Sequence, residues 1–381
     1  MYKIGVLGAG TWGMALARML CNAGNDVTVW SALGEEIDAF SSTRRHPNLP
    51  DMVIPDELAF TKSIEEVCRD KDILLFAVPS VFVRGTAAAA GKYIPDGQVI
   101  VDVAKGIEAD TLMTMSEVIR SELGKEPEKE DGGEGGDTGR RAPRNVKIVA
   151  LSGPTHAEEV AMDMPTTIVS ACEDIAAAEM VQDVFMGSPE KPTCMRVYTN
   201  TDVKGVELCG ALKNIIALSA GISAGLGYGD NARAALITRG LAEIERLGVK
   251  MGCVEQTFYG LAGMGDLIVT ATSRHSRNNR AGFLIGRGEK PAEAVKKVGM
   301  VVEGINALPA AVRLAGRYDV EMPIVTLVDD IVNRGADAAE TAAKLMGRRK
   351  KAELPGRAEE YYFARLLAEA IRSRQQDQTG A

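Results

Sequence analysis

A glycine-rich turn stands near the start of the chain, where Gly8, Gly10 and Gly13 have the spacing G-x-G-x-x-G. A short apolar run precedes these glycines, and a run of good helix formers follows at 14–20. In such a strand–turn–helix unit the first glycine permits a tight turn, the second lets a pyrophosphate approach, and the third allows close helix–strand packing. The helix N-terminus offers unpaired N–H groups and its positive dipole end to phosphate. The spacing alone is weak evidence, but this context predicts a dinucleotide-binding site.

Lys213 is the one charged residue in the apolar, small-residue segment 208–221, which we interpret as a helix. Its helical neighbours three and four residues away are Cys209, Gly210, Ile216 and Ala217. No carboxylate is close to it in sequence, and burial would lower the pKa of its ammonium, which favours proton transfer near neutral pH. An isolated lysine more often extends from a helix edge to water. Asn214 and the surrounding glycines favour a cavity here instead.

A group of polar donors follows the glycine-rich bend at 260–265. Asp266 presents a carboxylate directly after the bend, and Ser276, Arg277 and Asn278 combine hydroxyl, guanidinium and amide groups. Such donors suit a small phosphate. The alternative is a turn followed by the start of a basic helix.

Further polar residues follow the predicted strands at their carboxyl ends, where open α/β sheets bind ligands. Lys105 comes just after the strand at 99–103, Gly153 and Thr155 come after the strand that ends at 151, and Pro79 and Ser80 come after the strand that ends at 78. Any one of these segments could be a simple loop, but their convergence on one sheet edge favours a site. His156 and His275 have no paired acid at a useful spacing, so we expect both to be bystanders.

Alternating strands and helices characterise the first part of the chain. Besides the opening strand, near-continuous apolar runs predict strands at 27–30, 72–78, 99–103, 146–151, 166–169 and 195–198. Such runs between helical stretches are typical of a doubly wound, mostly parallel sheet. From about Asp202 to Gly347 helical patterns take over. The predicted fold class is therefore α/β, with an N-terminal Rossmann-like sheet and an all-helical C-terminal domain.

The domain boundaries follow from these shifts. We expect a dinucleotide-binding domain at 1–201, a helical substrate and catalytic domain at 202–348, and a C-terminal extension at 349–381. The acidic, glycine-rich stretch 124–144 has little apolar surface to bury and is predicted to be a flexible insert.

Composition excludes several classes of protein. The 381 residues are 46% hydrophobic and 25% charged, with a net charge of −8, which argues against nucleic-acid and anionic-membrane partners. No segment approaches the ~20 uninterrupted apolar residues of a membrane span, and no signal peptide is evident. The six cysteines lack C-x-x-C spacing and are expected to be reduced in the cytoplasm. The three histidines are scattered, so no metal site is predicted.

The motifs together resemble bacterial NAD(P)-dependent glycerol-3-phosphate dehydrogenases. The segments that carry the resemblance are 8–13, 104–106, 152–157, 210–214, 231–240, 263–266, 276–278 and 301–304. They run in order from residue 1 to about residue 348. A related superfamily, which includes 6-phosphogluconate and hydroxyisobutyrate dehydrogenases, also uses a Lys–Asn pair on a helix. That superfamily lacks the 231–240 block and the Ser-Arg-Asn triplet.

The resemblance implies reversible reduction of dihydroxyacetone phosphate to sn-glycerol 3-phosphate for phospholipid synthesis, with Lys213 as the catalytic acid and base. It implies a glycerol-phosphate site lined by Lys105, Gly153, Thr155, Lys213, Asp266, Ser276, Arg277 and Asn278. It implies cofactor contacts from Thr11, Trp12, Lys105, Ala157, Arg277, Val301 and Glu303, beside Gly8, Gly10 and Gly13.

The sequence carries no strong signal for the choice between NAD and NADP. Where the family usually has a basic or histidine side chain after the second strand, this chain has Ser31 and Ala32, and no Asp or Glu stands at the strand end. We favour NADP slightly, through Arg44 or Arg45. Two alternatives to the enzyme stay open: a non-catalytic dinucleotide sensor, and a hydroxy-acid dehydrogenase of the Lys–Asn superfamily. A homodimer is one assembly that such a chain can adopt.

Overall fold

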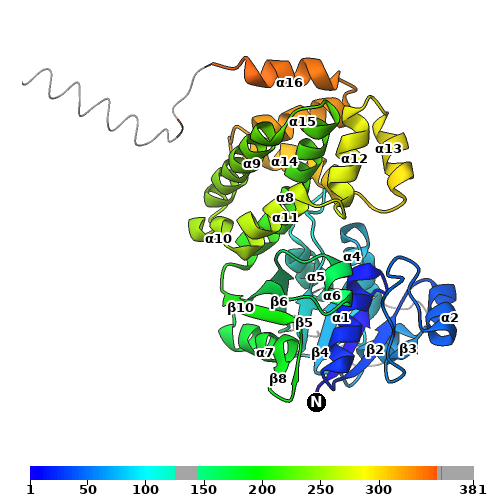
Figure 1. The fold of residues 1–381 in the computed structure, drawn as a ribbon. Helices are drawn as coiled ribbons and strands as arrows, with labels where there is room; N and C mark the ends of the chain where they lie inside the picture. The colour runs from blue at the N-terminus through cyan, green and yellow to red at the C-terminus, as the bar shows by residue number, and fades with distance from the viewer. Residues whose placement is uncertain (125–144, 350–352, 354–381) are drawn as a thin grey trace, which may run out of the picture. The chain divides into compact units, whose positions relative to one another are not determined.

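The computed structural model describes residues 1–124, 145–349 and 353 (Figure 1). Most of the predicted insert and of the predicted C-terminal extension lies outside these residues. The chain divides into two compact units, Met1–Thr341 and Ala342–Ala381. The description below concerns the larger unit. The exception is the last helix, Ala338–Met346, which begins in the larger unit and ends in the smaller one.

An eight-stranded sheet forms the N-terminal part of this unit, in the order β10-β7-β6-β5-β4-β1-β2-β3. Its strands are β1 (Lys3–Leu7), β2 (Asp26–Trp30), β3 (Ala59–Thr61), β4 (Ile73–Phe76), β5 (Val99–Asp102), β6 (Lys147–Ser152), β7 (Thr166–Ala171) and β10 (Met195–Asn200). The run from β3 to β6 is parallel, β7 pairs antiparallel with β6, and β10 is parallel to β7. The predicted mostly parallel sheet is confirmed. The 3-2-1-4-5-6 order of its parallel part is that of dinucleotide-binding folds.

The sequence did not predict three short strands. The three residues of β3 are too few to show a hydrophobic period. The strands β8 (Gly187–Ser188) and β9 (Lys191–Pro192) form a separate small hairpin whose residues are exposed or half-buried and show no apolar period.

Helices cover both faces of the large sheet. Successive side chains of a strand point to opposite faces, so Val6 and Leu75 join one apolar core while Leu7 and Leu74 join the other. The first core is completed by α1 (Thr11–Asn22), α2 (Gly34–Thr43), α6 (Ala157–Ala161) and α7 (Ile175–Met186). The second is completed by α3 (Ile64–Cys68), α4 (Val83–Gly91) and α5 (Met115–Leu123). The sheet is therefore doubly wound, as predicted.

The rest of the described chain is helical, as expected from about residue 202. The elements are α8 (Val203–Gly225), α9 (Asp230–Lys250), α10 (Glu255–Tyr259), the π-helical turn η2 (Leu261–Gly265), α11 (Asp266–Thr272), α12 (Arg277–Gly286), α13 (Pro291–Val298), α14 (Glu303–Arg317), α15 (Pro323–Asn333) and α16 (Ala338–Met346). Helix α8 is long and apolar enough to cross a membrane, yet its most apolar 18-residue window is 94% buried. It is a core helix around which other helices pack (Figure 1).

Glycines bring the backbones of α8 and α12 into direct contact. A Cβ atom on Gly282 would collide with the carbonyl oxygen of Leu218, and one on Gly221 with that of Asn279. Gly225 and Gly286 meet the facing helix backbone in the same way. Since α8 carries Lys213 and α12 begins with Arg277, these glycines set the separation of two predicted site residues.

We predict that Gly282→Ala destabilises the protein by about 3 kcal/mol, because the added methyl must push two packed helices apart. The control is Gly316→Ala on α14, where a Cβ would have no neighbour within 4 Å. Replacing that exposed helical glycine should be neutral or stabilising by up to ~1 kcal/mol. Urea unfolding of both variants measures the difference. Equal midpoints would contradict the close contact between α8 and α12.

Candidate active site

The glycine-rich turn has the geometry that a pyrophosphate needs. Gly8 has φ of 119°, and a Cβ on it would lie 2.7 Å from the carbonyl oxygen of Ala77. A Cβ on Gly13 would collide with the carbonyl oxygen of Gly8, so this glycine permits the close packing of α1 on β1. A Cβ on Gly10 would meet nothing within 4 Å. Gly10 caps α1 without a side-chain hydrogen bond, which leaves the helix N-terminus open to an anion.

A buried cluster of charges lies where the loop after β5 meets α8 and α11. The Asp266 carboxylate accepts hydrogen bonds from two lysines. Its Oδ1 atom lies 2.6 Å from Lys213 Nζ, and its Oδ2 atom lies 2.7 Å from Lys105 Nζ. Lys213 Nζ also donates to Thr270 Oγ1 over 2.5 Å, and Lys105 Nζ to the carbonyl oxygen of Gly153 over 3.2 Å. One carboxylate therefore joins the sheet edge to the helical part of the chain.

Local structure explains how this cluster forms. Asp266 is the first residue of α11, directly after the π-helical turn, and Thr270 lies one helical turn further on the same face. The Thr270 hydroxyl donates to the Asp266 carbonyl oxygen over 2.7 Å, which orients its lone pairs for Lys213. Gly210 lies one turn before Lys213 on α8, and a Cβ there would stand 3.0 Å from Ser152 Oγ and 3.4 Å from Lys105 Cγ. The absence of a side chain at Gly210 thus makes room for Ser152 and lets Lys105 lie against α8.

Burial lowers the pKa of Lys213 to about 7, since the positive charge of Lys105 adds to desolvation and the attraction of Asp266 only partly offsets it. Burial by itself would raise the pKa of the Asp266 carboxyl, but the charges of Lys105 and Lys213 outweigh it and lower that pKa. Asp266 is therefore ionised at neutral pH, while Lys213 is divided between ammonium and amine. This is the property expected of a group that gives and takes a proton.

The start of α12 is held in place by an amide network. Asn278 Nδ2 donates to Asn214 Oδ1 over 3.0 Å, and Asn278 Oδ1 accepts from the N–H of Gly304 over 2.8 Å. The Ser276 hydroxyl caps α12 by accepting from the N–H of Asn279. Ser276 and Asn278, both predicted to bind substrate, thus already have protein partners that fix the helix.

Arg277 lies between these two residues and is half-buried. Within residues 1–124 and 145–349 it makes no ion pair, while its charge reaches Lys213 and helps to lower the pKa of that amine. Arg277 is accordingly a cation beside the cluster that has no counter-ion of its own in the described chain.

The remaining predicted residues lie at the same sheet edge or at the start of α14. Thr155 follows β6 and donates to the carbonyl oxygen of Gly153 over 3.1 Å, and Ala157 begins α6. Glu303 begins α14 and accepts a hydrogen bond from the Ser80 hydroxyl over 2.8 Å. This bond joins the loop after β4 to α14, next to Gly106, whose lack of a side chain makes room for Ser80.

Sequence reasoning missed the roles of Thr270 and Ser80 in these contacts. The spacing of Thr270 from Asp266 would have revealed it as a neighbour on the same helical face. No local signal could have revealed the pairing of Ser80 with Glu303, because 223 residues separate them.

His156 and His275 lie together, with ring centroids 6.0 Å apart. Burial and then the charge of Lys213 lower the pKa of His156, so this ring is close to the cluster. Its buried Nε2 atom has no hydrogen-bond partner among the described residues. That both histidines are bystanders stays a prediction.

The structure removes the basis for NADP binding through Arg44. The guanidinium of Arg44 donates to the carbonyl oxygens of Pro55 (3.2 Å) and Leu58 (2.8 Å), and it lies over the ring of Phe60. Arg44 is thus used to hold its own loop. Arg45 is exposed.

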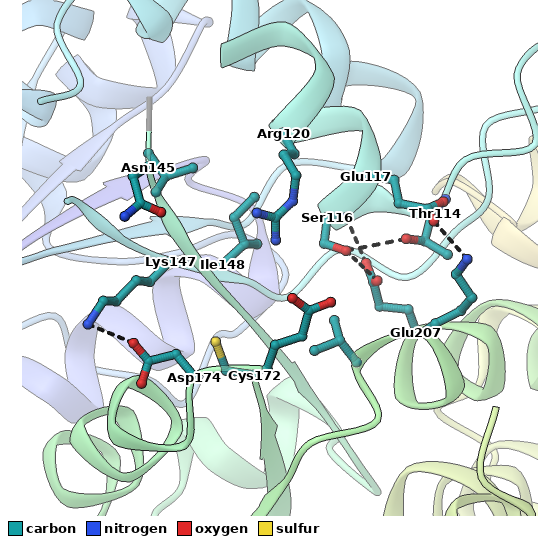
Figure 2. A pocket seen from close by; sticks show the side chains of 14 residues that line it. Thr114, Ser116, Glu117, Arg120, Asn145, Lys147, Ile148, Cys172, Asp174 and Glu207 are labelled. Carbon is teal, nitrogen blue, oxygen red and sulfur yellow. Dashed lines mark hydrogen bonds and ion pairs between the residues drawn. The ribbon is translucent and has the colours of Figure 1, made fainter. Parts of the chain in front are cut away.

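A separate pocket of 390 Å³ lies between α5, β6 and the start of α8 (Figure 2). It contains none of the predicted site residues. Its polar wall is largely paired: Glu207 accepts from the N–H and hydroxyl of Ser116 (2.7 and 2.6 Å), and Lys204 pairs with Glu117 at 2.9 Å. These bonds cap α5 and attach α8 to it, two helical turns before Lys213. The pocket shows how the helix that carries Lys213 is anchored.

Comparison with known proteins supports the same interpretation. The sequence matches the family models described as NAD-dependent glycerol-3-phosphate dehydrogenase N-terminus, over residues 3–130 and 139–178, and C-terminus, over residues 202–343. It is 68% identical to a glycerol-3-phosphate dehydrogenase [NAD(P)+] 2 of Lactobacillus delbrueckii subsp. bulgaricus, over 93% of this chain and 99% of the relative. It is 46% identical to the glycerol-3-phosphate dehydrogenase [NAD(P)+] of Agathobacter rectalis, over 93% of this chain and 98% of the relative.

A solved structure gives the same result for the fold. The crystal structure of glycerol-3-phosphate dehydrogenase from Coxiella burnetii is 33% identical in sequence, with a TM-score of 0.81 over 91% of this chain and 99% of that one. On the sequence matches and on this likeness, the chain belongs to the NAD-dependent glycerol-3-phosphate dehydrogenase family.

Proposed function

We propose that the protein catalyses the reversible, NAD(P)H-dependent reduction of dihydroxyacetone phosphate to sn-glycerol 3-phosphate. The observation that carries this proposal is the buried Lys213, which has a pKa of about 7, lies 2.6 Å from the Asp266 carboxylate and is within reach of the charge of Arg277. The two relatives are named as dehydrogenases of glycerol 3-phosphate that use NAD(P)+, which supports the same reaction and cofactor. The reaction would supply glycerophospholipid synthesis in the cytoplasm. A homodimer stays a prediction.

The residues around the glycine-rich turn fit a dinucleotide. The open space at Gly10 and the free N-terminus of α1 would hold the pyrophosphate, and Trp12, Ala157, Val301 and Glu303 are proposed to contact the cofactor. When bound, the reduced nicotinamide supplies the hydride that the carbonyl carbon needs.

Lys213 is proposed to give the proton that the carbonyl oxygen needs as the hydride arrives. An ammonium has three N–H donors. In Lys213 two of them are used, one by Asp266 and one by Thr270, so one is left for the substrate oxygen. In the reverse direction the neutral amine takes the proton from the hydroxyl. Asp266 orients the amine, and burial together with the charge of Lys105 keeps its pKa low.

Arg277 is proposed to bind the substrate phosphate, because a guanidinium can hold two phosphate oxygens at once. Lys105, Gly153 and Thr155 lie at the facing sheet edge and are proposed to complete the substrate site. Ser276 and Asn278, through their bonds to neighbouring backbone and to Asn214, would keep Arg277 in place.

The activity is tested by loss of nicotinamide absorbance with dihydroxyacetone phosphate and with unphosphorylated dihydroxyacetone. We expect turnover with the first compound only, because the phosphate is the group that Arg277 binds. The proposal would be contradicted if the protein turned over a hydroxy acid but not dihydroxyacetone phosphate. It would also be contradicted if the protein bound the dinucleotide but turned over none of these compounds.

Lys213→Ala is expected to lower kcat by roughly 10²–10⁴-fold, the usual contribution of a general acid or base, while cofactor binding is kept. The control is Lys250→Ala, which removes an exposed lysine at the end of α9. Steady-state kinetics with dinucleotide titration separates the two effects. A near-normal kcat in Lys213→Ala would move the proton-transfer role to Lys105.

Arg277→Ala is expected mainly to raise KM for dihydroxyacetone phosphate, because it removes binding that ground state and transition state share. Arg280→Ala is the matched control, since Arg280 lies on the same helix and is exposed. An unchanged KM in Arg277→Ala would exclude this residue as the phosphate ligand.

The pH dependence follows from the pKa of Lys213. Reduction needs the ammonium, so its kcat/KM should fall as pH rises through about 7, whereas the oxidation rate should rise over the same range. Asp266→Asn removes a charge that raises this pKa, so the midpoint should move to lower pH. Lys105→Met removes a charge that lowers it, so the midpoint should move to higher pH. The pH–rate profiles of the wild type and the two variants test this prediction. Midpoints that move in the same direction in both variants would contradict the assignment of the midpoint to Lys213.

A further inference from the structure

We propose that Glu36 makes the dinucleotide site select NAD over NADP. This inference rests on the proposed function, because it concerns the adenosine ribose of the same cofactor. It begins with Ser31, the residue that follows β2. The N–H of Gly8 donates to the carbonyl oxygen of Trp30 over 2.9 Å, and Leu7 is paired in register with Trp30. Ser31 therefore lies directly beside the glycine-rich turn, at the strand end where the ribose of a bound dinucleotide is read.

A carboxylate reaches this point from the next helix. Glu36 lies in the first turn of α2, and its Oε2 atom accepts a hydrogen bond from the Ser31 hydroxyl over 2.8 Å. The Ser31 oxygen in turn accepts from the N–H of Leu33 over 3.1 Å. The sequence has no Asp or Glu directly after the strand, but in the folded chain α2 places the Glu36 carboxylate at the strand end.

The neighbouring ring of His46 marks the same location. His46 lies close enough to the glycine-rich turn for the backbone of Ala9 to act on its pKa, as the charge of Glu36 also does. Burial outweighs both effects and lowers that pKa. Its Nδ1 atom accepts from the N–H of Asn48 over 3.2 Å, as a neutral imidazole does. His46 therefore lies near both Glu36 and the glycine-rich turn, and as a neutral ring it does not offset the charge of Glu36.

The nearby cations have other partners. Lys62 lies against Gly34 at the start of α2, but its Nζ atom pairs with Asp38 at 2.7 Å. Arg44 is bound to the carbonyl oxygens of its own loop. In the described chain, Glu36 forms no ion pair, so its negative charge at the strand end is not cancelled.

This charge distinguishes the two cofactors. A ribose 2′-hydroxyl can donate a hydrogen bond to a carboxylate, as the acid of NAD-binding folds accepts one. A 2′-phosphate would bring about two negative charges to the same place and meet repulsion. Glu36 therefore favours NADH and disfavours NADPH.

The test is direct binding of NADH and NADPH, measured as Kd by calorimetry in the absence of substrate. We expect the wild type to bind NADH at least ~10-fold more tightly. Glu36→Gln keeps an acceptor for Ser31 but removes the charge, and should strengthen NADPH binding by ~10-fold. The matched control is Glu35→Gln, which removes the neighbouring, exposed charge from the same helical turn and should leave the ratio of the two Kd values unchanged.

Two more variants sharpen the result. Glu36→Arg should reverse the preference, and Arg45→Ala should leave it unchanged. The inference is overturned if the wild type binds NADPH as tightly as NADH, if Glu36→Gln and Glu36→Arg both keep the wild-type ratio, or if Arg45→Ala selectively weakens NADPH. Binding of neither dinucleotide by the wild type would instead contradict the proposed function itself.

Discussion

The structure depends on one carboxylate shared by two ammonium groups. Asp266 is buried, and its two oxygens bind Lys213 on the central helix and Lys105 at the sheet edge. A buried ion that loses its partner typically costs about 3–5 kcal/mol, so none of the three positions can change alone without consequence. Because burial disfavours the charged amine and two positive charges share one negative charge, the cluster gains from giving up a proton, and Lys213 is the group that can do so. The bond that attaches the helical part to the sheet thus also sets the acidity of the amine.

Such a cluster requires backbones to come closer than side chains normally allow. Gly210 makes room for Ser152, Gly106 for Ser80, and the facing glycines of α8 and α12 let those helices touch. Glycine weakens an isolated helix by roughly 0.5–1 kcal/mol at each position. Here that loss is offset by the packing of the helices on each other and by the amide network between Asn214 and Asn278. The glycine content of α8 is therefore a requirement of the site, and the helix is stable because it is buried on all sides.

Much of this was predictable from the sequence because the signals are local. The strand, glycine turn and helix at the start, the apolar helix with a single lysine, and the alternation of strands and helices each lie within a short stretch of chain. The parts that were missed depend on how the chain folds. Glu36 lies only five residues after Ser31, but its carboxylate reaches the strand end through the turn into α2, and Ser80 meets Glu303 across 223 residues of sequence. The three residues of β3 become a strand through pairing with β2, since they show no period of their own.

The site has to treat phosphate groups differently according to where they bind. At the glycine-rich turn, phosphate would be met by backbone N–H groups and a helix dipole, which carry no full charge. At the proposed substrate end, Arg277 offers a full positive charge with no counter-ion in the described chain. At the proposed ribose end, Glu36 offers a negative one. On the functions proposed, a dinucleotide without a third phosphate and a substrate with one phosphate are the two ligands that suit all three places. Selectivity for both ligands then follows from the two opposite charges, each at its own end of the site.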